Sequence, residues 1–154
     1  MLKIGDKAPE FSLPDQDGRI HTLSGYKGKW VLVYFYPKDN TPGCTKEACA
    51  IRDVWSEFEE LGAVVLGVSR DSVKSHRGFA DKQRLPFTLL SDESAGVIRS
   101  YNAWKKKKLA GREYMGIVRI SYLVDPQGRI AKVYQQVKPP EHAAEVLADL
   151  REMA

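Results

Sequence analysis

Residues 31–49 read VLVYFYPKDNTPGCTKEAC, an apolar run followed by a short polar connection and the start of a helical pattern. The β-branched and aromatic residues of Val31–Tyr36 predict a strand that is buried on both faces. Beyond the connection, apolar residues recur at helical spacing, at Ala48, Ile51, Trp55 and Phe58. Cys44 is therefore predicted to lie where a core strand gives way to the first turn of a helix.

The start of a helix favours negative charge at Cys44. The first N–H groups of a helix have no intrahelical acceptor, and the positive end of the helix dipole lies there. A thiolate is an anion, so the position predicts a reactive cysteine that loses its proton more readily than a free thiol, whose pKa is about 8.5. The alternative is that Cys44 is a small buried hydrophobic residue, which is a common role for free cysteine.

The composition is that of an ordinary globular protein. The chain has 154 residues, 43% hydrophobic and 29% charged, which indicates one domain over residues 1–154. A formal net charge of +4 weakly favours acidic surfaces and does not indicate nucleic-acid binding. Apolar runs such as Ala63–Val68 are too short to cross a membrane, and residues 1–6 lack the apolar segment of a signal peptide. Two cysteines are too few for a disulfide scaffold, and a reducing cytosol would not keep a structural disulfide. We therefore expect a cytoplasmic protein, and the short apolar runs predict that it binds no membrane.

The other patterns predict an α/β chain. Alternating or continuous apolar runs predict strands over Phe11–Leu13, Arg19–Thr22, Trp30–Tyr36, Ala63–Ser69, Phe87–Leu90, Gly116–Asp125 and Arg129–Tyr134. Helical spacing predicts helices over about Thr41–Leu61, Ser72–Gln83, Ser94–Tyr101 and Pro139–Met153. The polar segment between residues 102 and 116 is predicted to be a loop.

This element order predicts the fold. Strand–helix–strand units imply parallel neighbours, and a closing hairpin adds antiparallel ones. We therefore expect a thioredoxin-like α/β fold, with a mixed central sheet flanked by helices and an added N-terminal β-hairpin.

The residues around Cys44 resemble the peroxiredoxin family. The spacing Pro37-x-x-x-Thr41-x-x-Cys44 matches the peroxidatic signature of that family. The segment TPGCTKEAC at residues 41–49, followed by Arg52-Asp53, is similar to the Q-type subgroup, which is also called the bacterioferritin comigratory proteins.

The resemblance covers nearly the whole chain. It begins at residues 5–11, GDKAPEF, which look like the opening of the family, and extends to Gly116-Ile117-Val118-Arg119 and the strand that follows. A combined pattern of this length is specific, whereas the Cys-x4-Cys spacing alone would be weak.

The resemblance implies a thiol peroxidase that reduces hydrogen peroxide and small organic hydroperoxides. It implies that Cys44 is the nucleophile and that Arg119 is the catalytic arginine. The Thr41 hydroxyl and the N–H groups of Gly43 and Cys44 would bind the peroxide. Pro37, which has no N–H group and fixes the loop, would form one wall of the site. Thr41 is also expected to be an ordinary helix N-cap, a role that is compatible with peroxide binding. Without the resemblance, Arg119 would be interpreted as a solvated strand residue.

The resemblance also implies that Cys49 resolves the sulfenic acid of Cys44 as an intramolecular disulfide. In an intact helix, five residues give a rise of about 7.5 Å and a rotation of about 140°, which separates the Cα atoms by roughly 8.5 Å. A disulfide tolerates a Cα separation of at most ~7 Å. If Cys49 resolves Cys44, the first helical turns must therefore unwind. The alternative is that Cys49 is a packed residue and that an external thiol resolves Cys44.

The resemblance implies no cofactor, and thioredoxin or a similar dithiol as the reductant. The three histidines, His21, His76 and His142, have no metal-ligand spacing, so no metal is expected. The resolving cysteine that dimeric peroxiredoxins carry at the C-terminus is missing, which favours a monomer. Lys105–Lys108 is interpreted as solvated surface, with docking to an acidic partner as the alternative and nucleic acid a more remote one.

Two other functions are compatible with a reactive cysteine. A dithiol–disulfide oxidoreductase would carry Cys-x-x-Cys, which this sequence lacks. A redox sensor or chaperone-like binding module would oxidise at Cys44 without steady turnover.

Overall fold

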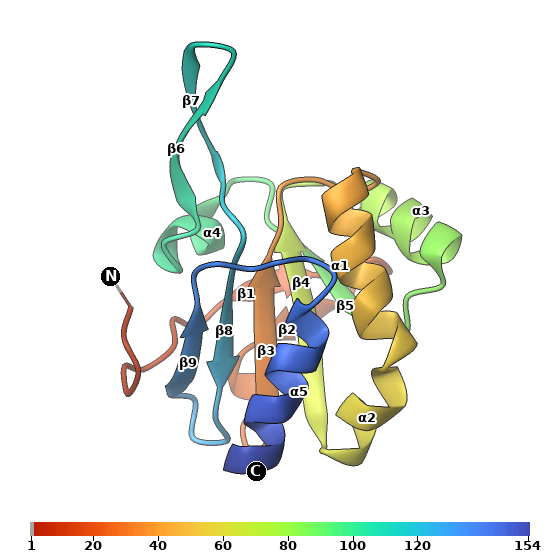
Figure 1. The fold of residues 1–154 in the computed structure, drawn as a ribbon, viewed down its shortest axis with the longest axis vertical. Coiled ribbons are helices and arrows are strands. Elements are labelled where there is room, and N and C mark those ends of the chain that lie inside the picture. The colour runs from red at the N-terminus through yellow and green to blue at the C-terminus, as the bar shows by residue number, and fades with distance from the viewer. Residues whose placement is uncertain (1) are drawn as a thin grey trace.

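The computed structural model describes residues 2–154, and a five-stranded mixed sheet forms its centre (Figure 1). The strand order is β5-β4-β3-β8-β9. β3 pairs in parallel with β4, as does β4 with β5, whereas β8 is antiparallel to both β3 and β9. The strands of this sheet are β3 (Trp30–Phe35), β4 (Ala63–Ser69), β5 (Thr88–Ser91), β8 (Ile120–Val124) and β9 (Ile130–Tyr134).

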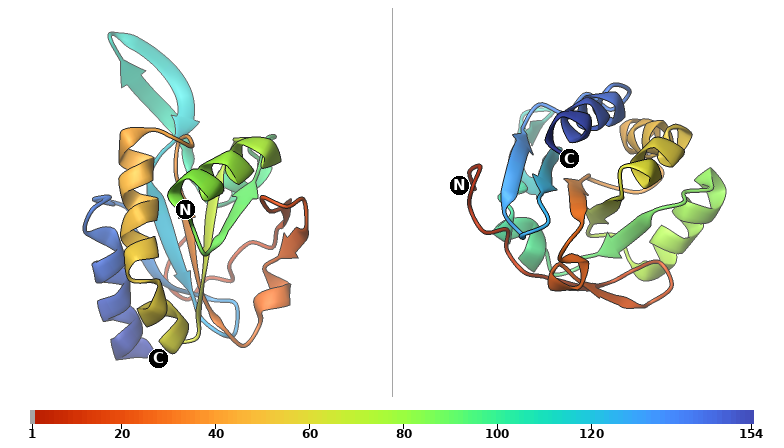
Figure 2. Two further views of the ribbon diagram at one scale, coloured as in Figure 1. Left: turned by 90° about the vertical axis from the view of Figure 1, so that its right-hand side faces the viewer. Right: turned by 90° about the horizontal axis from the view of Figure 1, so that it is seen from below.

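Helices cover both faces of the sheet (Figure 2). The helical elements are η1 (Ser24–Tyr26), α1 (Pro42–Asp53), α2 (Trp55–Glu60), α3 (Val73–Gln83), α4 (Gly96–Ser100) and α5 (His142–Met153). The N-terminal hairpin consists of β1 (Ser12–Pro14) and β2 (Ile20–Thr22), which pair antiparallel. The predicted α/β arrangement, with a thioredoxin-like sheet and an added N-terminal hairpin, is confirmed.

The side chains of β3 alternate between two apolar layers. Leu32 and Tyr34 pack among residues of α1, α2, α3 and α5. Val33 and Phe35 pack on the other face, with the N-terminal segment and α4. Every residue of β3 after Trp30 is buried, so the prediction of a strand covered on both faces is correct.

The loop between β3 and α1 begins at the carboxyl end of the central strand. In open α/β sheets, ligands bind outside the carboxyl ends of the strands. The first turn of α1 therefore lies at the edge of the sheet where a site is expected, and Cys44 lies in that turn.

The prediction of a loop between residues 102 and 116 is wrong. The segment forms an antiparallel hairpin of β6 (Trp104–Leu109) and β7 (Arg112–Ile117), which projects beyond the sheet on the side where α1 begins (Figure 1). Its two-residue turn, Ala110-Gly111, has positive φ at both positions, as a type I′ turn requires. Because the hairpin stands away from the core, neither face needs the apolar alternation by which strands are recognised.

Two other predicted boundaries are also wrong. The expected helix over Thr41–Leu61 is divided at Val54 into α1 and α2. The expected strand over Gly116–Asp125 is divided between β7 and β8, and Val118 and Arg119 lie between them. This break places Arg119 outside both strands.

No helix within residues 2–154 combines the length and the apolar character that crossing a membrane requires.

Candidate active site

Cys44 and Arg119 meet at the start of α1. Cys44 is in the first turn of the helix and is 1% exposed. The guanidinium of Arg119 reaches it from the segment between β7 and β8, and its Nη2 donates to the Cys44 Sγ at 3.1 Å. The guanidinium and the positive end of the helix dipole thus both face this sulfur. Cys44 and Arg119 are far apart in the sequence, and the fold brings them together.

Gly43 makes room for this contact. A Cβ atom at position 43 would lie 2.7 Å from the Nη2 of Arg119, which no real Cβ contact allows. A larger residue would therefore push the guanidinium away from the sulfur. In the part of the chain that the structure describes, the N–H groups of Gly43 and Cys44 have no hydrogen-bond acceptor, as expected for the first turn of a helix. Both remain available as donors beside the sulfur.

Thr41 occupies the N-cap position but does not form the predicted cap. Its backbone is extended, and no helix N–H donates to its side chain. Its Oγ1 donates instead to the carbonyl oxygen of Lys38 at 2.8 Å. The hydroxyl therefore stays in the loop before Cys44, with lone pairs left to accept a bond. Pro37 is half-buried in the same loop.

A buried polar network fixes the middle of this loop. The carboxylate of Asp39 accepts from the hydroxyl of Tyr36 at 2.6 Å and from that of Ser75 at 2.9 Å. Its Oδ2 also lies 2.7 Å from the Nδ1 of His76, whose Nε2 is 2.9 Å from the carbonyl oxygen of Leu90. Both ring nitrogens of His76 therefore have a polar partner within hydrogen-bond distance. This network ties the loop to α3 and β5.

The same network contains a possible set of metal ligands within the described residues. One ligand atom each from Asp39, Asp71 and His76 lie within 4.8 Å of one another. However, Asp71 Oδ2 already accepts from the backbone N–H of Asp39 at 2.9 Å and from the hydroxyl of Ser69 at 2.6 Å. A metal ion would have to displace these bonds, so the hydrogen-bonded arrangement accounts for the cluster.

Glu47 is a site residue that the sequence reasoning missed. It lies three positions after Cys44, on the same side of α1, and is 1% exposed. Its Oε1 accepts from the Nη1 of Arg119 at 3.1 Å, so the guanidinium bridges the carboxyl group and the sulfur. Burial raises the pKa of Glu47 to about 7, against the opposing effect of Arg119. The sequence feature that could have identified Glu47 is its spacing of three residues from Cys44 in a predicted helix.

Tyr34 adds a second unexpected polar group. Neither its hydroxyl nor the Oε2 of Glu47 has a hydrogen-bond partner within the described residues, although both are buried. Burial raises the pKa of Tyr34 well above its ordinary value, and the nearby Glu47 and Cys44 contribute to this shift. The Tyr34 hydroxyl therefore stays neutral and can donate.

The buried Glu47 carboxyl predicts a measurable pH dependence of stability. Its pKa is raised from 4.5 to about 7 in the folded state, so the folded protein binds this proton more tightly than the unfolded chain does. We expect the resulting stabilisation to be complete below about pH 4.5 and to be lost as the pH rises to about 7, with a total change of about 3 kcal/mol. Denaturant unfolding of wild type and Glu47→Gln across this range measures it, because the variant lacks the titrating group. A pH-independent difference between the two proteins would contradict the assignment.

Cys49 lies in the same helix as Cys44, and both are free thiols. Cys49 is half-buried, and its Sγ donates to the Oε1 of Gln83 on α3 at 3.4 Å. Because α1 is continuous from Pro42 to Asp53, the separation expected for an intact helix applies. A bond between the two sulfurs would require the start of α1 to open.

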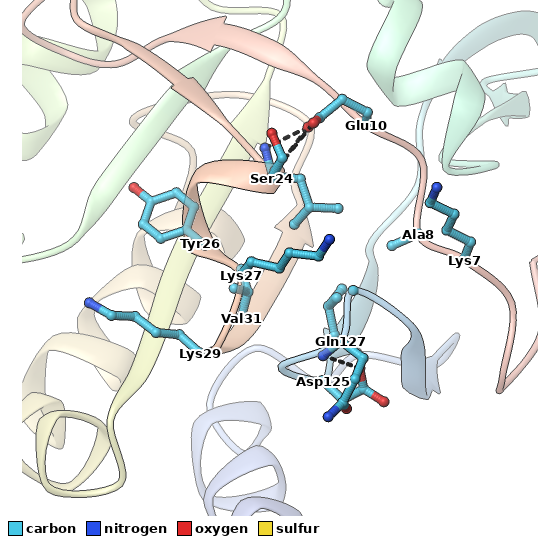
Figure 3. A pocket seen from close by; sticks show the side chains of 13 residues that line it. Lys7, Ala8, Glu10, Ser24, Tyr26, Lys27, Lys29, Val31, Asp125 and Gln127 are labelled. Atoms are coloured by element: carbon cyan, nitrogen blue, oxygen red, sulfur yellow. Dashed lines mark hydrogen bonds between the residues drawn. The ribbon is translucent and has the colours of Figure 1, made fainter.

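A cavity of about 200 Å³ lies at the other end of the sheet (Figure 3). It is lined by Val31 at the start of β3 and Val124 at the end of β8, together with Lys7, Lys27 and Lys29. The active-site loop begins at the opposite end of β3. This cavity is therefore separate from the site at Cys44.

The chain is similar to proteins of one family. The model of the AhpC/TSA family matches residues 4–133. Peroxiredoxin Bcp of Escherichia coli is 48% identical and that of Bacillus subtilis 47% identical, each over 153 residues, which are 99% of this chain and 98% of each relative.

A solved structure has the same fold. The bacterioferritin comigratory protein of Xanthomonas campestris, which has alkyl peroxide reduction activity, superposes with a TM-score of 0.91 at 38% identity. The match covers 99% of this chain and 98% of that one.

Proposed function

This chain belongs to the AhpC/TSA family and is a peroxiredoxin, a thiol peroxidase, and we propose that Cys44 is its peroxidatic nucleophile. The observation that carries this assignment is the contact between the Arg119 guanidinium and the Cys44 sulfur at the start of α1. Peroxide reduction begins with attack of a thiolate on one peroxide oxygen. A cation and a helix start beside the sulfur favour that anion at neutral pH.

The first step forms a sulfur–oxygen bond and breaks the oxygen–oxygen bond. The Cys44 sulfur becomes a sulfenic acid, and the other oxygen leaves with a proton as water or an alcohol. The leaving oxygen gains negative charge in the transition state, so donors beside it lower the barrier. Arg119 and the N–H groups of Gly43 and Cys44 are suited to that role. Thr41 and Pro37 would position and enclose the peroxide.

The Cys49 thiol is the proposed resolving group. Its attack on the sulfenic acid of Cys44 forms an intramolecular disulfide and releases water, so the protein is oxidised by two electrons in each cycle. This step requires the first turns of α1 to unwind. The Cys49 sulfur must leave Gln83, and the Cys44 sulfur must leave Arg119. The half-exposure of Cys49 and the position of α1 at the surface support such an opening.

A protein dithiol, thioredoxin or one similar to it, is the proposed reductant of this disulfide. Thiol–disulfide exchange returns both cysteines to thiols and leaves the reductant oxidised. We further propose hydrogen peroxide and small organic hydroperoxides as substrates, which fits the alkyl peroxide reduction named for the Xanthomonas campestris relative. The proposed setting is the cytoplasm, and the proposed state is a monomer without a metal or organic cofactor.

A coupled assay tests this function. Purified protein is supplied with thioredoxin, thioredoxin reductase and NADPH, and NADPH consumption is followed after addition of hydrogen peroxide or cumene hydroperoxide. We expect consumption that depends on both the protein and the peroxide, and that ceases when either is omitted. Peroxide-independent reduction of insulin disulfides would instead indicate a dithiol–disulfide oxidoreductase. A single oxidation without turnover would indicate a redox sensor.

A further inference from the structure

The β6–β7 hairpin concentrates the positive charge of the protein. Its five basic residues less its single acidic residue give +4, which equals the formal net charge of the whole chain. The rest of the molecule is therefore electrically balanced. The hairpin projects beyond the sheet at the end where β3 gives way to α1 (Figures 1 and 2). The excess charge thus lies at the same end of the molecule as Cys44.

The two faces of the hairpin differ in charge. Residues opposite each other in an antiparallel pair share a face, and the register pairs Lys105 with Gly116, Lys107 with Tyr114 and Leu109 with Arg112. One face, which we call the basic hairpin face, therefore consists of Lys105, Lys107, Leu109, Arg112 and Tyr114. Glu113 lies on the other face, 3.3 Å from Lys106 and 3.8 Å from Lys108, where it offsets positive charge.

The charges of the basic hairpin face are not neutralised by the part of the chain that the structure describes. Lys105 and Arg112 are exposed, and neither forms an ion pair within residues 2–154. Two apolar side chains accompany them, Leu109 at 69% exposure and Tyr114 at 45%. Exposed apolar groups among uncompensated cations are typical of a surface that binds a partner with acidic and apolar groups.

A groove of about 370 Å³ joins this face to the active-site loop. Lys107 and Tyr114 line it from the hairpin, and Pro37 and Lys38 line it from the loop that leads to Cys44. A macromolecule that approaches Cys44 from the side of Pro37 and Lys38 would therefore contact the hairpin. A small dithiol can reach the site without contacting the hairpin.

The base of the hairpin is fixed to the body of the protein. The ring of Trp104 lies beneath two guanidinium groups, 5.1 Å from that of Arg70 and 5.5 Å from that of Arg99. The Nζ of Lys107 donates to the carbonyl oxygen of Ile117 at 2.8 Å. A surface held in this way is preorganised for binding.

We propose that the basic hairpin face and its groove are the docking surface for an acidic protein dithiol that reduces the enzyme. This inference rests on the proposed function, because it assigns a surface to the reductant named there. Its charge would steer an acidic partner toward Cys44 and raise the association rate at low ionic strength.

The test compares two charge-reversal variants that lose the same net charge. Lys105→Glu/Arg112→Glu alters the basic hairpin face, and Lys27→Glu/Lys29→Glu alters the cavity at the opposite end of the sheet (Figure 3). With a thioredoxin of acidic pI, we expect the hairpin variant to lose about tenfold in kcat/KM for thioredoxin at low salt and the control less than about twofold. Turnover with dithiothreitol should be equal in all three proteins. Raising salt from about 20 to 200 mM should lower the wild-type value and leave the hairpin variant nearly unchanged.

Three other outcomes would each overturn a specific part of this proposal. Equal kcat/KM for thioredoxin in the two variants would overturn the docking surface while leaving the proposed function intact. Wild-type turnover with dithiothreitol but not with thioredoxin would overturn the proposed reductant, and the docking surface with it. Binding of wild type to phosphatidylglycerol vesicles, abolished in the hairpin variant while thioredoxin kinetics are unchanged, would assign the surface to lipid instead.

Discussion

Replacing Cys44 with serine is expected to abolish peroxide turnover. A serine hydroxyl is almost fully protonated at neutral pH and has no equivalent of the sulfenic acid, so the first bond cannot form. We expect a loss of at least about 10³-fold in the coupled assay, in the range seen when a catalytic nucleophile is removed. Stopped-flow consumption of hydrogen peroxide by the protein alone measures the same step without a reductant.

Cys49→Ser is the matched control for that variant. It makes the same chemical change in the same helix, five positions away, but should leave the first attack on peroxide intact. Circular dichroism and denaturant unfolding of both variants separate loss of chemistry from loss of folding. Peroxide consumption by Cys44→Ser at the wild-type rate would exclude Cys44 as the nucleophile.

Steady turnover of Cys49→Ser with thioredoxin is expected to fall by about 10²-fold or more, because its sulfenic acid has no neighbouring thiol to form a disulfide. The oxidised variant should accumulate as Cys44 sulfenic acid, which dimedone traps and mass spectrometry detects. In the wild type, oxidation should instead join Cys44 to Cys49. Amide exchange of residues 41–51 should then be faster than in the rest of the helical region.

Gln83→Ala provides the control for this second variant. It removes the partner that accepts from the Cys49 thiol but keeps the thiol itself. Turnover close to that of wild type would show that the thiol, and not its packing, is required. If Cys49→Ser also retained full turnover with thioredoxin, an external thiol would have to resolve Cys44, and Cys49 would be a packed residue.

Much of the fold follows from local patterns that tertiary contacts reinforce. The apolar run of β3 is buried on both faces, and Ser72 caps α3 by accepting from the N–H of Ser75, as a helix start predicts. The bounds of β4, Ala63–Ser69, are those that the sequence predicts. In each case the residue pattern and the burial in the fold favour the same structure.

The failures occur where the local pattern carries no burial signal. The hairpin of β6 and β7 exposes both faces, so its sequence lacks the alternation of a half-buried strand and reads as a loop. The feature that could have indicated the hairpin is the two-residue turn Ala110-Gly111, in which both residues have positive φ. Thr41 has the residue type of an N-cap, but its hydroxyl donates to the carbonyl oxygen of Lys38 and accepts from no helix N–H.

The candidate site was predicted in its residue types but not in its connections. The spacing around Cys44 indicated Pro37, Thr41 and Gly43, because they are neighbours in sequence. The bridge from Arg119 to Glu47 depends on how β8 pairs with β3, which no local pattern specifies. The buried hydroxyl of Tyr34 depends equally on the surrounding packing.

The charge of Cys44 at neutral pH is the central claim, and the ultraviolet absorbance of the thiolate measures it most directly. In Cys49→Ser, where Cys44 is the remaining thiol, we expect thiolate absorbance at neutral pH that disappears on addition of one equivalent of hydrogen peroxide. Adding Arg119→Leu should reduce that absorbance, since the guanidinium that faces the sulfur is lost. Absorbance that develops only in alkaline solution, or that peroxide does not remove, would contradict the account.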